Sequence, residues 1–442
     1  MSAGTVHVVG AGMAGLATAV RLAEAGIMVH LHEAAPQAGG RARSYLDATL
    51  GCRIDNGNHL LIAGNRSAMR YLDTIGARDM LTGPGEAAYH FFDCADGVRW
   101  VLRLNRGRLP WWILSPNRRV PGTKLRDYLA ALKLRRAATD DSVTDVLPAD
   151  TTIFRRLWQP LAIAALNTPL DQASAALLGI VLGESFGQGG AACVPLMPKE
   201  GLSETLVDPA LAYLRDRGAE IRFGARLRGI AFSGARVASL DFDSGAVTLA
   251  PGDAVVLAVT APVASRLLPE IAAPDAYHAI LNAHFRVDAP PASPLFIGIV
   301  GGTAEWVFKK PGLLSVTVSA ADRLMDTPTD ELAAALWRDV AAAYRLPAAP
   351  MPPVQIVKER RATFAASRAQ LARRPSAATR WPNLTLAGDW TATGLPATIE
   401  GAIRSGFTAA EVCRAGLARN SLSAADDHAT LAPLTRTAQS KA

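Results

Sequence analysis

The 442-residue sequence predicts an α/β protein of two domains, one of which is a Rossmann-like dinucleotide-binding domain. Three observations support this prediction. A glycine-rich turn lies between two apolar runs at the start of the chain, and an apolar run ending in Gly-Asp lies near its end. The chain is also longer than one ordinary hydrophobic core requires, so a second domain is expected between these motifs.

The N-terminal motif is a Gly-x-Gly-x-x-Gly turn that joins a predicted strand to a predicted helix. Its first glycine allows the tight turn, its second lets a pyrophosphate approach the backbone, and its third lets the helix pack closely on the strand. The helix N-terminus then offers free N–H groups and a partial positive charge to the phosphates. The residues concerned are Gly10, Gly12, Met13, Ala14 and Gly15.

A second predicted strand ends in Glu33, 23 residues after Gly10. An acid at an offset of about 20 residues holds a ribose 2′-hydroxyl, which favours FAD or NAD over NADP. Gly40, Arg41 and Arg43 follow soon after. This Gly-Gly-Arg extension resembles that of the flavin amine oxidase and phytoene desaturase superfamily, and the resemblance implies that Arg41 reaches the pyrophosphate of FAD.

The next motif contains Asp55, Gly57 and His59. These residues resemble a D-x-G-x-H stretch of the same superfamily that passes near the flavin. An acid and a histidine beside a redox centre can act as acid or base, and a purely structural Asp-Asn-Gly turn is the alternative. Asp55 and His59 are therefore our candidate proton donors.

Residues 88–137 combine aromatic and basic side chains, and between Arg99 and Arg136 eleven Lys or Arg residues face one acid. Trp111 and Trp112 with flanking cations are typical of an interfacial membrane segment, because indole rings sit at headgroup depth while guanidiniums meet anionic lipid. A basic solvated face over a tryptophan-containing core is the main alternative, and nucleic acid is disfavoured. We expect both rings to contact lipid.

Composition limits the class of protein further. The four cysteines are scattered without a C-x-x-C pair or histidines at metal-ligand spacing, so we expect reduced thiols and no bound metal. No signal peptide and no apolar run of about 18 residues are visible. We expect a cytoplasmic protein that is peripheral at the inner face of the membrane.

The segment at 150–190 is predicted to be helical. Its sequence Trp158-Gln-Pro-Leu161, followed by Leu166-Asn167-Thr-Pro, is similar to that of squalene-associated FAD-dependent desaturases, now understood as hydroxysqualene dehydroxylases. The resemblance implies that Trp158, Leu161, Leu166 and Asn167 line a tunnel for a polyprenyl chain. Taken alone, the segment is an apolar helical hairpin.

From Gly201 the sequence returns to an α/β rhythm. The expected elements are a helix near 203–217, a strand at 254–259, strands at 296–300 and 314–318, and a helix at about 329–344. Ile230 lies in a segment that resembles the one whose backbone contacts the adenine of FAD.

The C-terminal block has a predicted strand that ends in Gly388 and Asp389, and a helix that begins near Thr398 and Ile399. It resembles the terminal FAD motif of the superfamily, in which the Asp holds ribityl or pyrophosphate oxygens. The helix N-terminus can direct N–H groups at the flavin N1–C2=O edge, which favours the anionic reduced flavin. FAD is therefore the expected cofactor.

These motifs divide the chain into a Rossmann-like FAD-binding domain and a mixed α+β substrate domain. The FAD-binding domain is expected from residues 1–88, 201–272 and 379–418. The substrate domain is expected from 89–200 and 273–378, and a disordered tail from 419–442.

The resemblance implies an FAD-dependent oxidoreductase that reduces hydroxysqualene to squalene in hopanoid biosynthesis. Three alternatives stay open: a carotenoid or phytoene desaturase, a flavin amine oxidase, and a non-enzymatic FAD-binding isoprenoid carrier. An amine oxidase commonly carries Tyr where this chain has Thr398. No second nucleotide motif is visible, so we expect an unidentified electron donor beside the polyprenyl substrate.

Overall fold

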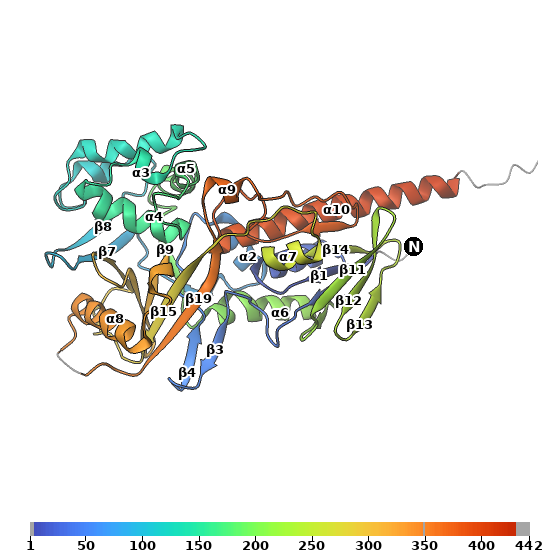
Figure 1. Cartoon of the computed structure of the whole chain (residues 1–442), viewed down its shortest axis with the longest axis horizontal. Coiled ribbons are helices and arrows are strands. Elements are labelled where there is room, and N and C mark those ends of the chain that lie inside the picture. Colours follow the sequence, from blue (N-terminus) through green and yellow to red (C-terminus); the bar gives the residue numbers. More distant parts are fainter. Residues whose placement is uncertain (1–3, 348–349, 430–442) are drawn as a thin grey trace, which may run out of the picture.

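A computed structural model of the chain describes residues 4–347 and 350–429 and has two lobes (Figure 1). One lobe contains a five-stranded parallel sheet and the long C-terminal helix. The other contains a seven-stranded sheet with helices on both of its faces. The predicted α/β class with a parallel sheet is confirmed.

The parallel sheet collects strands from three distant parts of the chain. Its order is β10 (Glu220–Arg222), β2 (Val29–His32), β1 (Val6–Val9), β14 (Ala254–Leu257) and β20 (Leu384–Leu386). The central strands β1 and β14 are buried along their whole length, and their sequences are apolar apart from His7. The carboxyl end of β1 leads directly into the glycine-rich turn.

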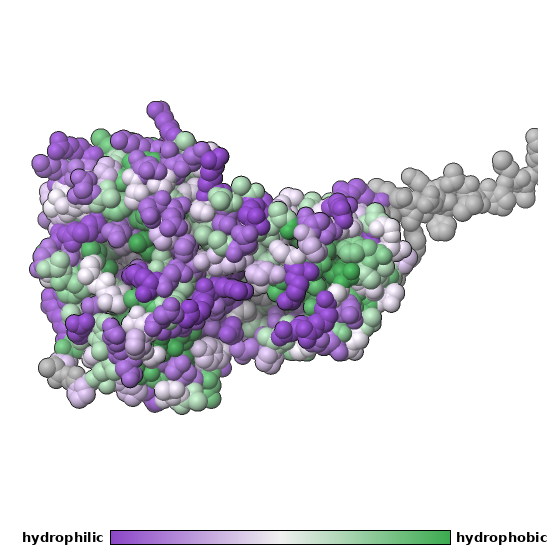
Figure 2. Space-filling model, in the orientation of Figure 1, coloured by the Kyte–Doolittle hydropathy of each residue, from purple (hydrophilic) through white to green (hydrophobic). Residues whose placement is uncertain are grey.

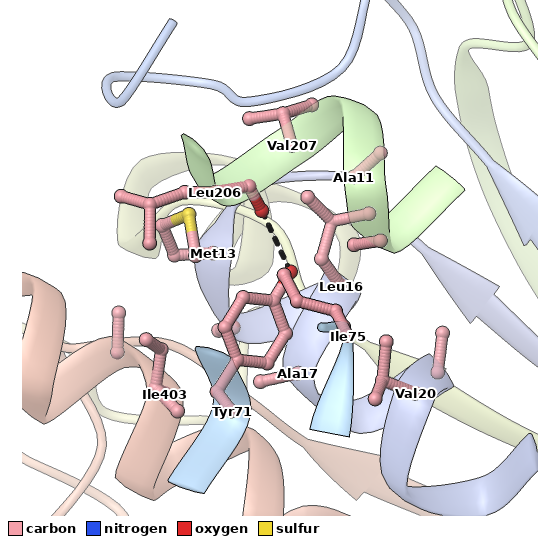
Figure 3. Packing of buried hydrophobic residues seen from close by; sticks show 14 of the residues in the cluster. Ala11, Met13, Leu16, Ala17, Val20, Tyr71, Ile75, Leu206, Val207 and Ile403 are labelled. Carbon is pink, nitrogen blue, oxygen red and sulfur yellow. Dashed lines mark hydrogen bonds between the residues drawn. The ribbon is translucent and has the colours of Figure 1, made fainter. Parts of the chain in front are cut away.

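Helix α1 (Met13–Glu24) is the centre of the core of this lobe (Figure 3). It packs against α10 (Ile399–Ala429), α6 (Asp208–Arg215) and the short helix η6 (Ser203–Val207), and α2 (Arg66–Thr74) packs on α10. The Tyr71 hydroxyl of α2 donates to the Leu206 carbonyl at 2.8 Å. A Cβ on Gly406 would lie 2.4 Å from the Ala14 carbonyl oxygen, so only glycine lets α10 approach α1 this closely.

The seven-stranded sheet is antiparallel except where β16 pairs with β7. Its order is β19 (Val354–Phe364), β15 (Tyr277–Phe285), β18 (Leu313–Val318), β17 (Trp306–Lys310), β16 (Phe296–Val300), β7 (Ala88–Asp93) and β8 (Arg99–Arg103). Successive side chains alternate between its faces, so Phe296 packs under the helical layer while Ile297 packs on the side of α8 (Thr329–Tyr344).

The helical layer covers one face of this sheet. It consists of η2 (Trp111–Leu114), η3 (Leu125–Arg136), α3 (Val143–Val146), η4 (Phe154–Trp158), α4 (Gln159–Leu166), α5 (Ala175–Glu184) and η5 (Phe186–Gln188). No helix among the described residues is both long enough and apolar enough to span a membrane.

Small sheets and short helices connect the lobes and flank the parallel sheet. The small sheets are β3 (Ser44–Asp47) with β4 (Cys52–Asp55), β5 (Leu61–Ile62) and β6 (Leu81–Thr82) with β9 (Pro195–Pro198), and β11 (Leu227–Ser233) with β12 (Arg236–Phe242) and β13 (Gly245–Thr248). The remaining helices are η1 (Arg78–Met80), α6 (Asp208–Arg215), α7 (Ala261–Leu267), η7 (Ala321–Leu324) and α9 (Arg368–Leu371).

The end of the chain differs from the expectation. Helix α10 continues to Ala429, so residues 419–429 are helical where a disordered tail was expected. No Gly or Pro occurs between Leu417 and Ala429 to end the helix. The remainder of the expected tail, residues 430–442, lies outside the described residues.

Candidate active site

The N-terminus of α1 forms an open cradle. Gly12 is the N-cap residue with a φ of −74°, and no side chain caps the helix. A Cβ on Gly12 would meet nothing within 4 Å, whereas a Cβ on Gly15 would lie 1.8 Å from the Gly10 carbonyl oxygen. The helix therefore packs tightly behind an open approach to its first N–H groups, those of Met13 and Ala14, which suits a pyrophosphate.

The Glu33 carboxylate lies beside this cradle. Its Oε2 accepts the Ala11 N–H at 2.7 Å, and its Oε1 accepts the Ala35 N–H at 2.8 Å. Each oxygen keeps a lone pair for a further donor, which suits a ribose hydroxyl. The structure thus brings together the glycine-rich turn and the acid predicted to accompany it.

The Gly-Gly-Arg loop and the C-terminal Gly-Asp meet at the same place. A Cβ on Gly40 would lie 3.3 Å from the Gly12 Cα. Arg41 Nη2 donates to Asp389 Oδ2 at 2.6 Å, and Arg41 Nη1 donates to the Ala362 carbonyl at 2.5 Å. Asp389 is buried, so its ion pair with Arg41 fixes both groups.

Arg374 organises the loop after Asp389, and the sequence analysis did not identify it. Its guanidinium donates to the carbonyls of Asp389, Thr391 and Leu395 at 3.0, 2.9 and 2.8 Å. Burial lowers the pKa of Arg374 to about 10, which still leaves it charged at neutral pH. No sequence motif marks this arginine, because most of its acceptors are backbone carbonyls.

The N-terminus of α10 is held by two side chains. Thr398 Oγ1 accepts the Gly401 N–H at 3.0 Å, which caps the helix that Ile399 opens. The Glu400 carboxylate accepts the N–H groups of Ser67 and Ala68 at 3.1 and 2.8 Å and so caps α2. Glu400 is a second positioning residue that the sequence analysis did not single out.

Asp55 is enclosed by donors. Its Oδ2 lies 2.5 Å from Lys310 Nζ, and its Oδ1 accepts the Ser44 hydroxyl at 2.6 Å and the Leu202 N–H at 2.9 Å. Burial alone would raise the pKa of Asp55, but Lys310 and the other donors lower it below the ordinary value. The carboxylate therefore carries no proton at neutral pH, which argues against Asp55 as the proton donor.

His59 lies near Asp55, in a loop that reaches the seven-stranded sheet. The neighbouring Asn58 Nδ2 donates to Thr317 Oγ1 at 3.0 Å, which fixes the loop on β18. Burial lowers the pKa of His59 to about 4. A neutral imidazole is a weak acid, so His59 is also a poor donor at neutral pH.

The predicted tunnel residues lie mostly in the core. Trp158, Leu166 and Asn167 are buried, and Leu161 packs against the same apolar cluster. A cavity of about 680 Å³ lies beside them, and its described lining includes Ile163 but none of these four residues. The prediction that these four residues line a tunnel for a polyprenyl chain stays a prediction.

The candidate adenine-binding residue and the candidate lipid-binding tryptophans lie in different parts of the molecule. Ile230 lies half-buried on β11, outside the parallel sheet. Trp111 is 62% exposed, whereas Trp112 is 6% exposed and packs edge-on against Tyr128. The expectation that both rings contact lipid is wrong for Trp112, which belongs to the core of the helical layer.

The chain is similar in sequence and in fold to known flavin-dependent enzymes. The family described as flavin containing amine oxidoreductase matches residues 13–414. A hydroxysqualene dehydroxylase from Rhodopseudomonas palustris is 50% identical over 409 residues, covering 92% of this chain and 98% of that protein. Its counterpart from Zymomonas mobilis is 47% identical over 406 residues, covering 92% and 98%. Cyclohexylamine oxidase from Brevibacterium oxydans shares the fold, with a TM-score of 0.68 at 16% identity over 93% of this chain and 99% of that one.

The groups gathered at the end of β1 fit FAD. The open helix N-terminus at Gly12 suits the pyrophosphate, and the Glu33 carboxylate beside it can accept a hydrogen bond from a ribose hydroxyl, while Asp389 and Arg41 bring a second acid to the site. FAD is the cofactor and the protein is an oxidoreductase. The chain belongs to the flavin containing amine oxidoreductase family, among its hydroxysqualene dehydroxylases.

Proposed function

We propose that this protein reduces hydroxysqualene to squalene by reductive dehydroxylation. The observation that carries this proposal is the identity of 46–50% to three hydroxysqualene dehydroxylases over 92% of the chain. The FAD cradle described above is consistent with it. The polyprenyl substrate follows from the names of these relatives, and the pathway is that of squalene and hopanoids.

When bound, reduced FAD supplies the hydride that replaces the hydroxyl group. The residues of this chain bind and orient the cofactor and exclude water, as in other cofactor enzymes. Hydroxide is a poor leaving group, so the leaving oxygen also needs a proton donor inside an apolar pocket. Asp55 and Lys310 form an ion pair that fastens β4 to the substrate sheet, which is a positioning role.

The test is a single turnover under anaerobic conditions. The purified flavoprotein is reduced, hydroxysqualene is added, and flavin reoxidation is followed together with squalene by mass spectrometry. Squalene equimolar with reoxidised flavin supports the proposal. Reduced flavin that persists without squalene contradicts it, and desaturation of a phytoene-like substrate by the oxidised protein would then favour the desaturase alternative.

We also propose that the helical layer docks on an anionic lipid surface at the inner face of the membrane. Exposed large apolar side chains gather between residues 109 and 132 of this layer: Leu109, Trp111, Leu114, Leu125, Leu129 and Leu132. In the part of Figure 2 that corresponds to the helical layer, hydrophobic residues lie scattered among hydrophilic ones. A bilayer contact supplies a route for a substrate that is insoluble in water, and reduction of FAD is assigned to a separate electron donor.

A further inference from the structure

The cavity of about 680 Å³ contains a polar pair that the sequence did not reveal. His278, the second residue of strand β15, and Asp322, in η7, both line it. His278 Nδ1 lies 2.8 Å from Asp322 Oδ2, and the two side chains are 15% and 48% exposed. Much of the remaining wall is apolar and includes Phe154, Ile163 and Leu170.

The pair has a fixed orientation. Asp322 Oδ1 accepts the Ala279 N–H at 3.2 Å, so both carboxylate oxygens have partners on β15. Because Nδ1 of His278 is committed to Asp322, Nε2 is the ring nitrogen left for a ligand. Within residues 4–347 and 350–429, no hydrogen bond to this Nε2 is found.

Asn167 holds the backbone on both sides of the pair. Its Nδ2 donates to the His278 carbonyl at 3.3 Å, and its Oδ1 accepts the Ala320 N–H at 2.7 Å, two residues before Asp322. Asn167 has a φ of 45°, a left-handed conformation that asparagine adopts more readily than most residues. The asparagine of the Leu166-Asn167-Thr-Pro motif thus fixes the backbone beside both His278 and Asp322.

The cavity borders the FAD site. Tyr277, the neighbour of His278, also lines the cavity. Burial raises the pKa of Tyr277 to about 12, and the Asp389 carboxylate acts in the same direction. Arg41, which pairs with Asp389, donates to the Ala362 carbonyl on β19, and the next residue, Thr363, pairs with His278 between β19 and β15.

We propose that His278 is the proton donor to the leaving hydroxyl group, with Asp322 and Asn167 as positioning residues. This proposal rests on the proposed function. The Nε2–H proton passes to the hydroxyl oxygen as the C–O bond breaks, and water leaves with the electron pair of that bond. The carbon then accepts the hydride with its electron pair, and the imidazole recovers a proton from solvent.

The surroundings of His278 support this role. Asp322 accepts the Nδ1–H of His278 and so fixes the orientation of the ring, as the acid of a catalytic triad does, which directs Nε2 to the ligand. The other ionisable groups in the lining are Asp171, Tyr277 and Arg323. A polyprenyl chain bound along the apolar wall would cover the exposed face of Asp322 and exclude water from the reacting carbon.

The experiment compares two leaving groups in His278→Gln, using reduced holoenzyme. Hydroxysqualene needs a proton on its leaving oxygen, whereas its acetate ester leaves as acetate without one. We expect His278→Gln to lose about 100-fold or more on the alcohol, in the range of general acid catalysis, and less than about tenfold on the ester. A rate on the alcohol within about threefold of wild type, or equal losses on both substrates, would overturn the proposal.

Two further variants separate proton donation from folding. Asp322→Asn keeps the size of the side chain, and we expect a smaller loss on the alcohol that the ester again relieves. His90→Gln changes a half-buried histidine on β7 that does not line this cavity, and both rates should match those of wild type. Flavin content verifies that each variant is folded. Failure of wild type to form squalene contradicts the proposed function itself, whereas an unimpaired His278→Gln contradicts only the donor assignment.

Discussion

The ion pair between Asp55 and Lys310 is a residue-scale link between the lobes. The two side chains are 3% and 13% exposed. Lys310→Met leaves the Asp55 carboxylate buried without its cation, and breaking a buried pair in this way costs about 3–5 kcal/mol. We expect urea unfolding at pH 7 to show a loss of this order. The double variant Asp55→Asn, Lys310→Met removes both charges and should recover most of it, and equal losses in the two variants would exclude this explanation.

Glu305 gives the stability of the protein a pH dependence. Its Oε2 accepts the Ser319 N–H at 2.7 Å, and burial raises its pKa from the ordinary 4.5 to about 7. The folded state therefore favours the protonated form, so this contribution is fully present below pH 4.5 and is lost as the pH rises through 7. Since one pKa unit corresponds to about 1.4 kcal/mol, a rise from 4.5 to about 7 makes the loss on the order of 3 kcal/mol.

Glu305→Gln should remove this dependence. We expect its Tm to fall less than that of wild type between about pH 5 and pH 8, because the amide cannot ionise. Glu331→Gln, on the exposed first turn of α8, is the control and should keep the wild-type slope. Parallel Tm curves for all three proteins would show that Glu305 does not titrate in this range.

At the scale of the element, the glycines of the turn before α1 have different roles: Gly12 serves cofactor binding, whereas Gly15 serves the packing of the helix. Gly12 has a φ of −74° and free space around its Cβ position, so Gly12→Ala should fold normally. The added methyl group nevertheless occupies the approach of the pyrophosphate. We expect FAD binding to weaken at least tenfold, equivalent to about 1.4 kcal/mol, measured by flavin titration of the apoprotein.

The matched control is Gly183→Ala on α5, which also has open space at its Cβ position and lies in the other lobe. It should keep the wild-type affinity for FAD. Gly15→Ala should instead fail to fold, because its Cβ would lie 1.8 Å from the Gly10 carbonyl oxygen. Normal FAD binding by Gly12→Ala would show that the pyrophosphate lies elsewhere.

Local sequence patterns predicted helices and strands well, because secondary structure depends on residues that are close in the sequence. Helix α8 occupies Thr329–Tyr344, as its apolar spacing predicted. The partners of Asp55 and His278 could not be predicted in the same way. Asp55 meets Lys310 across 255 residues and His278 meets Asp322 across 44, and no spacing rule connects such positions. Tertiary packing likewise decides that Trp111 is exposed while its neighbour Trp112 is buried.

At the scale of the whole molecule, the helical layer joins a basic surface to the cavity. The segment from Arg99 to Arg136 carries eleven cations and one acid. Both η2 and η3 lie in this segment, and η3 packs on α5 and α3. The cavity is bounded by η4 and α4 of the same layer. The proposed lipid contact and the cavity therefore belong to the same helical layer.

This arrangement predicts a specific loss of lipid binding. Trp111, Leu129 and Leu132 are 62%, 55% and 59% exposed on η2 and η3. Replacing all three with Ser removes apolar groups that are each worth about 1.5–3 kcal/mol when fully buried. We expect co-sedimentation with phosphatidylglycerol-containing vesicles to weaken at least tenfold, and salt to weaken wild-type binding because it screens the cations.

The controls distinguish lipid binding through the helical layer from nonspecific hydrophobic binding. Phe232→Ser removes an aromatic side chain that is 38% exposed on β11, in the other lobe, and vesicle binding should not change. Trp112→Ser should lower the Tm, because Trp112 packs in the core of the layer. If the triple variant bound vesicles as wild type does, the lipid contact would lie on another surface. If it bound weakly yet reduced detergent-solubilised hydroxysqualene at the wild-type rate, the layer would serve delivery of the substrate and not the chemistry.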